Sequence, residues 1–168
     1  LVKAAKEYYG HGVCAVDLAG DEAAFPVRQQ AVMFQTAKEL GIPFTIHAGE
    51  CQNAQSIWDA LELGASRIGH GIAARKDPRL MEYCVQHKIP FEMCPVSNLQ
   101  TKAVQSMEEY PLFLFLKKGI PVTINTDNRT VSNTSITREL QMIQEYYGCA
   151  DEVLETLMKH ARDAAFSS

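Results

Sequence analysis

Pro43-Phe44-Thr45-Ile46-His47-Ala48-Gly49-Glu50 is a short apolar run that ends in polar residues, and it sets the pattern for the whole chain. The run predicts a strand over Pro43–Ala48, followed by a turn at Gly49. His47 and Glu50 would then leave the strand together, so an imidazole and a carboxylate can share one cavity. Imidazole suits zinc, and the carboxylate suits acid–base work. A hydrogen-bonded strand-end histidine with a glutamate in solvent is the plainer alternative.

Four more apolar runs predict strands of the same kind, and amphipathic segments between them predict helices. The other strands are Val13–Leu18, Arg67–His70, Ile89–Cys94 and Val122–Asn125. The predicted helices are Pro26–Leu40, Ala54–Leu63, Asp77–His87, Pro111–Lys118, Ser135–Tyr147 and Asp151–Ala165. Strand ends fall near residues 18, 48, 70, 94 and 126, which gives repeating strand–helix units. Such repeats predict an α/β fold with a parallel sheet.

An open doubly wound sheet and a closed barrel both fit this periodicity. Polar or ionisable residues follow each strand, as they do in barrel enzymes that build sites from several strand ends. The Gly-x-Gly-x-x-Gly turn of a dinucleotide-binding sheet is absent from the sequence. A complete (β/α)₈ barrel of the TIM type usually needs about 250 residues. We therefore expect residues 1–168 to form a single unit holding about five βα units of an incomplete barrel.

Two further strand ends carry candidate functional groups. His70 lies between two glycines in Arg67-Ile68-Gly69-His70-Gly71, where the backbone can approach other groups closely. Asp127 follows the last strand, although an aspartate there can also cap a helix or form a turn. Cys94 shows no sign of activation as a nucleophile. The remaining histidines lie in or beside helices and are expected to be surface or packing residues: His11, His87 and His160.

Five motifs in this order resemble those of the adenosine deaminase family, and the resemblance covers essentially the whole chain. The motifs are Asp17-Leu18-Ala19-Gly20-Asp21-Glu22, His47-Ala48-Gly49-Glu50, Arg67-Ile68-Gly69-His70-Gly71, Cys94-Pro95-Val96-Ser97-Asn98 and Asn125-Thr126-Asp127. One four-residue match would be weak, but five in register are specific. The resemblance implies that the strands are the fourth to eighth of a (β/α)₈ barrel.

The resemblance also implies a role for individual residues in the zinc-dependent deamination of a purine nucleoside. His47 and Asp127 are similar to ligands of the Zn²⁺ cofactor. Glu50 is similar to the acid that protonates purine N1, and His70 to the group that orients and helps deprotonate the zinc-bound water. The backbone N–H of Gly20 is similar to the one that donates to purine N3.

The sequence departs from the family in two ways. No His-x-His pair, which supplies two further zinc ligands from the first strand in the family, occurs in the chain. Asn128 stands where many members have a second acidic residue that donates to purine N7. An amide NH₂ can also donate, so N7 recognition is kept in principle. Adenosine, and with it 2′-deoxyadenosine, is the expected substrate. Adenine and other aminopurines or nucleotides remain alternatives, whereas the His-x-Glu and Pro-Cys-x-x-Cys pattern of cytidine-type deaminases is absent.

Composition argues against several other classes. The net charge is −4 and basic residues are scattered, so no nucleic-acid partner is expected. No apolar run approaches the roughly 20 residues of a membrane-spanning helix, and no signal peptide is recognisable. The five cysteines include no Cys-x-x-Cys pair, which suits reduced thiols in the cytoplasm.

The chain by itself is expected to be an inactive part of the enzyme. It has no initiator methionine and opens in what reads as a helix. Its partner would be the missing amino-terminal half of the barrel or a second copy. Two open sheet edges, at Val13–Leu18 and Val122–Asn125, and an apolar inner face would drive that association. A fold unit without catalytic activity is the alternative function.

Overall fold

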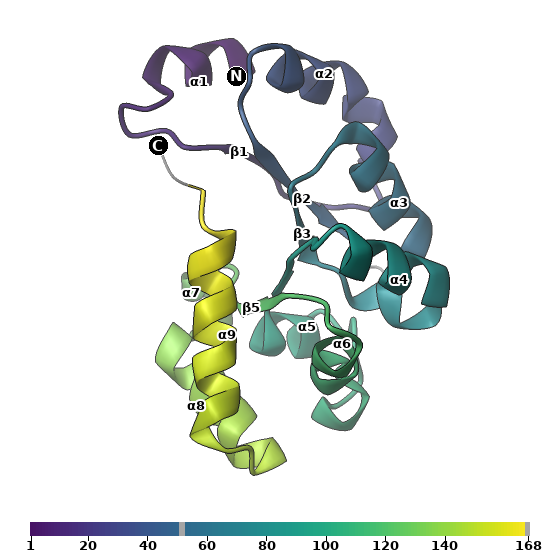
Figure 1. The fold of residues 1–168 in the computed structure, drawn as a ribbon, viewed down its shortest axis with the longest axis vertical. Coiled ribbons are helices and arrows are strands. Elements are labelled where there is room, and N and C mark those ends of the chain that lie inside the picture. The colour runs from purple at the N-terminus through teal and green to yellow at the C-terminus, as the bar shows by residue number, and fades with distance from the viewer. Residues whose placement is uncertain (51–52, 167–168) are drawn as a thin grey trace.

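The protein contains a five-stranded parallel sheet, seen in a computed structural model that describes residues 1–50 and 53–166. Figure 1 shows the strands side by side, with α2, α3 and α4 along one side of the sheet. The strand order is β1-β2-β3-β4-β5, so neighbours in sequence are neighbours in space. The strands are β1 (Val16–Leu18), β2 (Phe44–Ala48), β3 (Arg67–His70), β4 (Phe91–Met93) and β5 (Val122–Ile124). All five predicted strands and their parallel arrangement are confirmed.

Nine α-helices accompany these strands within the described residues. They are α1 (Val2–Tyr8), α2 (Ala31–Glu39), α3 (Ala54–Leu63), α4 (Pro78–Gln86), α5 (Pro95–Gln100), α6 (Leu112–Lys118), α7 (Arg129–Ser132), α8 (Ile136–Tyr147) and α9 (Asp151–Ala164). The predicted helix over Pro26–Leu40 begins instead with a 3₁₀ turn at Val27–Gln30 and becomes α-helical at Ala31. The short helices α5 and α7 were not predicted.

Most predicted helix boundaries are confirmed because local capping groups set them. The side chain of Asp77 accepts hydrogen bonds from the backbone N–H groups of Arg79 and Leu80 at the start of α4. Gly64 ends α3 in the left-handed conformation, which glycine adopts without a Cβ clash. Ser135 caps α8 by accepting from the N–H of Arg138. Each cap is a short-range signal, so sequence alone could locate it.

The two faces of the sheet differ in polarity. The face toward the helices is apolar and carries the core residues Phe44, Ile46, Ile68, Phe91, Met93 and Val122. The inner face is polar, which corrects the expectation of an apolar inner face: it presents Asp17, Thr45, His47, Arg67, Glu92 and Asn125 to one cavity. Strand side chains alternate between faces, and the polar positions all fall on the same side.

A partly buried ion pair crosses the inner face toward the amino-terminal ends of the strands. Arg67 Nε lies 2.6 Å from Glu92 Oε1, and the Thr45 hydroxyl donates to the other carboxylate oxygen at 2.7 Å. Arg67 also donates to the carbonyl of Ala164 at 2.8 Å, and its guanidinium stacks on the ring of Phe166. These contacts tie the end of α9 to the inner face.

The sheet has open edges at β1 and β5 among the described residues, as expected. Every described helix is too short or too polar to cross a lipid bilayer. The described cysteines are free thiols: Cys14, Cys84, Cys94 and Cys149. Cys51 lies outside the described residues. His160 packs against β5, where its Nδ1 accepts from the N–H of Val122 at 3.2 Å, in agreement with a packing role.

Candidate active site

His47 and His70 face each other at the carboxyl ends of β2 and β3. Their ring centroids are 5.0 Å apart and the rings are nearly perpendicular. Gly69 pairs with His47 across the two strands, and a Cβ on Gly69 would come within 2.6 Å of the His47 ring. Only glycine leaves room for this imidazole, so the glycine in the motif supports the position of the neighbouring histidine.

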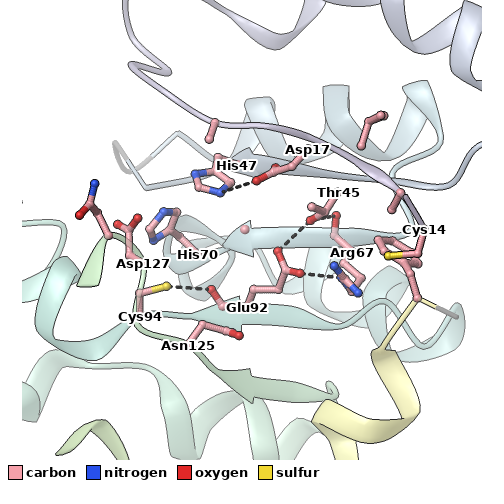
Figure 2. A pocket seen from close by; sticks show the side chains of 16 residues that line it. Cys14, Asp17, Thr45, His47, Arg67, His70, Glu92, Cys94, Asn125 and Asp127 are labelled. Carbon is pink, nitrogen blue, oxygen red and sulfur yellow. Dashed lines mark hydrogen bonds and ion pairs between the residues drawn. The ribbon is translucent and has the colours of Figure 1, made fainter. Parts of the chain in front are cut away.

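His47 lies among carboxylates in a cavity of about 520 Å³ on the inner face (Figure 2). Its Nε2 is 3.5 Å from Oδ2 of Asp17. Burial disfavours the imidazolium, but the hydrogen bond and charge of Asp17, together with Asp127 and Glu92, outweigh it and raise the pKa of His47.

Asp127 enters the same cavity from the end of β5. Its backbone has a φ of 53°, a left-handed conformation that aspartate tolerates better than most residues. The hydroxyl of Ser97 donates to Asp127 Oδ2 at 2.6 Å. One carboxylate oxygen is therefore held by the protein, and the side chain as a whole remains exposed at the cavity.

His70 is almost fully buried, and burial together with the nearby His47 lowers its pKa despite the charge of Glu50. Its Nδ1 lies 2.9 Å from Nδ2 of Asn98, while the Tyr110 hydroxyl donates to Asn98 Oδ1 at 3.2 Å. With the amide in this orientation, Nδ1 accepts and the neutral ring carries its proton on Nε2. If the Asn98 amide is rotated by about 180°, its oxygen accepts from Nδ1–H of His70. Nε2 of His70 then carries no proton and can act as a base.

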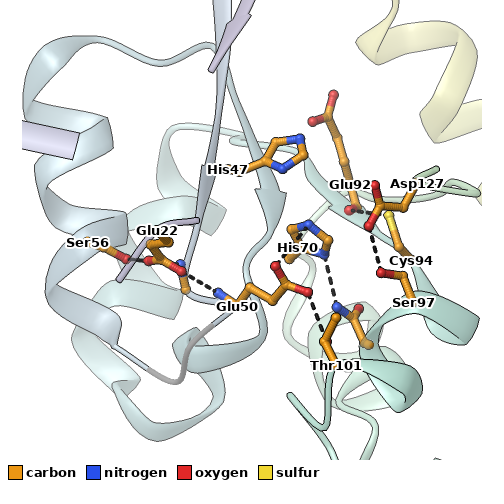
Figure 3. A network of polar contacts seen from close by, with 12 residues as sticks. Glu22, His47, Glu50, Ser56, His70, Glu92, Cys94, Ser97, Thr101 and Asp127 are labelled. Carbon is orange, nitrogen blue, oxygen red and sulfur yellow. Dashed lines mark hydrogen bonds and ion pairs between the residues drawn. The ribbon is translucent and has the colours of Figure 1, made fainter. Parts of the chain in front are cut away.

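Glu50 completes the polar cluster from the turn after β2 (Figure 3). Its Oε2 is 3.6 Å from His70 Nε2, and its Oε1 accepts a hydrogen bond from the Thr101 hydroxyl at 2.9 Å. The carboxyl side chain is about one-fifth exposed. Glu50 is thus held beside His70 while it can still reach a bound molecule.

Side chains of α5, and of Thr101 directly after it, make hydrogen bonds to three of the candidate residues. Ser97 contacts Asp127, Asn98 contacts His70, and Thr101 contacts Glu50. The start of α5 is fixed in turn by Glu139 of α8, whose buried carboxylate accepts from the N–H of Val96 at 3.0 Å. The sequence predicted Ser97 and Asn98 as part of a family motif but did not predict these contacts. Pro95 at the first helical position was the available signal.

Gly20 and Asn128 line the approaches to the cluster. Gly20 borders one hollow with His47 and another with Glu50. Asn128 lines the main cavity and caps α7, where its Oδ1 accepts from the N–H groups of Thr130 and Val131 at 3.1 and 3.0 Å. All six predicted site residues therefore lie around one end of the sheet.

The donor set suits part of a zinc site. His47 offers an imidazole nitrogen and Asp127 a carboxylate oxygen in one cavity, and these atoms are ordinary zinc ligands. Within residues 1–50 and 53–166, no three histidine, cysteine or acidic side chains are grouped closely enough to hold a metal by themselves. A site built on these two residues needs further ligands. Burial raises the pKa of the Cys94 thiol, with Asp127 and two glutamates adding to the effect, so this thiol is a poor nucleophile.

Comparisons with known proteins identify the family. Residues 1–168 match the protein family described as adenosine deaminase. The adenosine deaminase of Haemophilus ducreyi is 44% identical over 167 residues, which make up 98% of this chain and 48% of that protein. The chain spans about half the length of the curated relatives it matches.

Solved structures of related deaminases have the same fold over this chain. An adenine deaminase from Arthrobacter aurescens superposes with a TM-score of 0.89 at 25% identity, covering 99% of this chain and 53% of that one. The N6-methyl-AMP deaminase from Arabidopsis thaliana gives a TM-score of 0.90 at 27% identity, with 99% and 49% covered. The predicted barrel-type α/β fold is confirmed, with about half of the barrel in this chain.

Proposed function

Because the chain belongs to the adenosine deaminase family, we propose that it forms the carboxy-terminal half of an enzyme that hydrolyses adenosine and 2′-deoxyadenosine to the inosine nucleosides and ammonia. The observation that carries this proposal is the convergence of His47, Glu50, His70 and Asp127 at one end of the sheet. An acid, an imidazole and two metal-ligand types at strand ends on one edge of the sheet are what a hydrolytic deamination requires.

His47 and Asp127 would hold zinc, with two more ligands from the half of the barrel outside this chain. When bound, zinc would make water a strong nucleophile near neutral pH. Asp17 lies beside His47 and Ser97 beside Asp127, so each ligand has a neighbouring polar group that fixes its orientation. The carboxylates of Asp17 and Asp127 near His47 would attract a cation to this place.

Glu50 would deliver a proton to N1 of the purine while water attacks C6. Attack on the aromatic ring places negative charge on its nitrogens, and a carboxylic acid at N1 neutralises that charge as it develops. His70, 3.6 Å from Glu50, would orient the attacking water and help remove its proton. The base function of His70 requires the turned-over orientation of the Asn98 amide, which leaves Nε2 without a proton.

Gly20 and Asn128 would bind the purine at its other nitrogens. The N–H of Gly20 would donate to N3. For Asn128, the capping bonds occupy Oδ1 and turn the NH₂ group away from α7, where it can donate to N7. Adenine and N6-methyl-AMP are the alternative substrate types, since fold relatives act on them. The high identity to adenosine deaminases favours adenosine.

Residues 1–168 would form one unit of the barrel domain and would need the other half for activity. The open edges at β1 and β5 and the incomplete zinc ligand set support this proposal. The partner is an amino-terminal half or, failing that, a second copy of the chain. The free thiols suit the reducing cytoplasm as the place of action.

The test uses a complete barrel, made by fusing this chain behind the amino-terminal half of the Haemophilus ducreyi relative. Adenosine, 2′-deoxyadenosine, adenine, AMP and N6-methyl-AMP are assayed for release of ammonia. We expect the highest kcat/KM on adenosine. Glu50→Gln should lower kcat by about 10²–10⁴ and leave zinc content nearly unchanged, because glutamine keeps the shape but delivers no proton. Turnover above half of wild type in that variant would remove Glu50 from the mechanism.

A further inference from the structure

Glu22 contacts the turn that carries Glu50, although it lies outside the proposed reaction. Its Oε1 accepts from the backbone N–H of Gly49 at 2.7 Å, and its Oε2 accepts from the backbone N–H of Glu50 at 3.1 Å. The hydroxyl of Ser56 also donates to Oε1. One carboxylate from the loop after β1 thus binds two consecutive amides of the turn after β2. Figure 3 shows its contacts with Ser56 and with Glu50.

The turn itself has little freedom to move. Gly49 has a φ of +74°, and a Cβ there would come within 2.5 Å of the Ile57 side chain. The N–H of Gly49 also donates to the Ser56 hydroxyl at 2.9 Å. Gly49 therefore has two acceptors, whereas Glu22 Oε2 is the acceptor found for the amide of Glu50. The direction in which Glu50 leaves the turn depends on that second bond.

The geometry assigns Glu22 as a positioning residue for Glu50, an inference that rests on the proposed function. Glu22 fixes the backbone of Glu50 and Thr101 fixes its carboxyl group, so the acid is held at both ends. A displacement of about 1 Å at a reacting group can lower turnover about 10²-fold. Glu22 acts through the backbone, so its loss changes the placement of Glu50 rather than the purine contacts.

Glu22→Gln tests this inference with little change in shape. Glutamine has one acceptor oxygen where glutamate has two, so one of the two turn amides loses its partner. In the complete barrel we expect kcat to fall about 10- to 100-fold with KM nearly unchanged. Glu62→Gln, which removes one charge from an exposed side chain on α3, is the control and should keep full turnover.

A double variant separates positioning from general structural damage. If Glu22 works through Glu50, then Glu22→Gln should cause almost no further loss in a Glu50→Gln background. Equal losses in both backgrounds, or turnover within twofold of wild type in the single variant, would overturn the inference. Absence of deamination by the wild-type complete barrel on every substrate would instead count against the proposed function.

Amide exchange in the complete barrel gives a readout that needs no activity. NMR should show slow exchange of the Gly49 and Glu50 amide protons in the wild-type protein. In Glu22→Gln the Glu50 amide should exchange at least tenfold faster, whereas Gly49 keeps Ser56 as acceptor and stays protected. Fast exchange of the Glu50 amide in the wild type, or no change in the variant, contradicts the contact.

Discussion

Ser97 donates a hydrogen bond of 2.6 Å to Oδ2 of Asp127, and this contact links the start of α5 to the end of β5. A hydroxyl donor to a carboxylate at this distance is a strong, charge-assisted hydrogen bond. It selects one rotamer of the proposed zinc ligand and leaves the other oxygen to face the cavity.

The first prediction follows from that contact. Ser97→Ala should weaken zinc binding by the complete barrel about 10- to 100-fold, because an unsupported ligand must be ordered when metal binds. Activity should return at high zinc concentration. Competition with a chromophoric chelator measures the affinity, and Ser106→Ala, whose hydroxyl caps no helix N–H, is the matched control. Unchanged zinc affinity in Ser97→Ala would show that the bond does not support a ligand.

Asp127→Ala should behave differently, because it removes a ligand atom rather than its support. Zinc content should drop and activity should fall with it, without recovery at high zinc. Atomic absorption on the purified complete barrel measures the metal, and circular dichroism checks the fold. Stoichiometric zinc in a well-folded Asp127→Ala protein contradicts the ligand role.

Glu139 predicts a pH dependence of stability. Burial raises its pKa, and the Val96 N–H, the Thr134 hydroxyl and Arg138 only partly oppose this. The folded state therefore holds the proton more tightly than the unfolded state. The resulting stability is fully present below the unfolded pKa of about 4.3 and is lost as the pH rises through the higher folded pKa.

Glu139→Gln should remove this dependence, since a glutamine oxygen can still accept from Val96. The free energy of unfolding of the variant minus that of wild type should therefore increase between about pH 4 and pH 8, because only the wild type loses stability as the pH rises. Urea titrations at both pH values measure it. Glu145→Gln, a change of the same charge on the exposed face of α8, corrects for net charge. If the difference in unfolding free energy between Glu139→Gln and wild type does not change with pH, the raised pKa of Glu139 does not contribute to stability.

The amide of Asn128 makes a prediction about substrate analogues. A 7-deaza analogue of adenosine should lose about 1–3 kcal/mol of transition-state binding, because the amide donor covered by the bound purine is left without its acceptor. Asn128→Ala has no side-chain donor, so this penalty should vanish in the variant. Equal kcat/KM for adenosine and the analogue in the wild-type enzyme would mean that the contact does not exist.

The fold was predictable because its signals are local. Each strand is an apolar run, and caps such as Asp77 and Gly64 mark helix ends within a few residues. The first strand was predicted too long: Val13 makes an isolated bridge to Tyr9 instead, and β1 begins at Val16. The chain folds back on itself between Tyr9 and Val13, and the hydrophobic periodicity of the sequence does not reveal such a contact.

The candidate site was predictable only in part. His47, Glu50, His70 and Asp127 stand at strand ends, and a parallel sheet brings such residues together whatever their separation in sequence. The supporting contacts of Glu22 and Thr101 depend on loop geometry and join residues 28 and 51 positions apart. The polar inner face was missed because alternation in strands of three to five residues is too short to read.

Zinc content and adenosine turnover of the 168-residue chain, with and without a separately made amino-terminal half, test the central claim most directly. The chain alone should bind zinc weakly, should be inactive, and should associate through its open edges, as seen by light scattering. Adding the other half should give about one zinc per complex together with deamination. A monomeric chain that binds stoichiometric zinc and deaminates adenosine with no partner present would contradict the account.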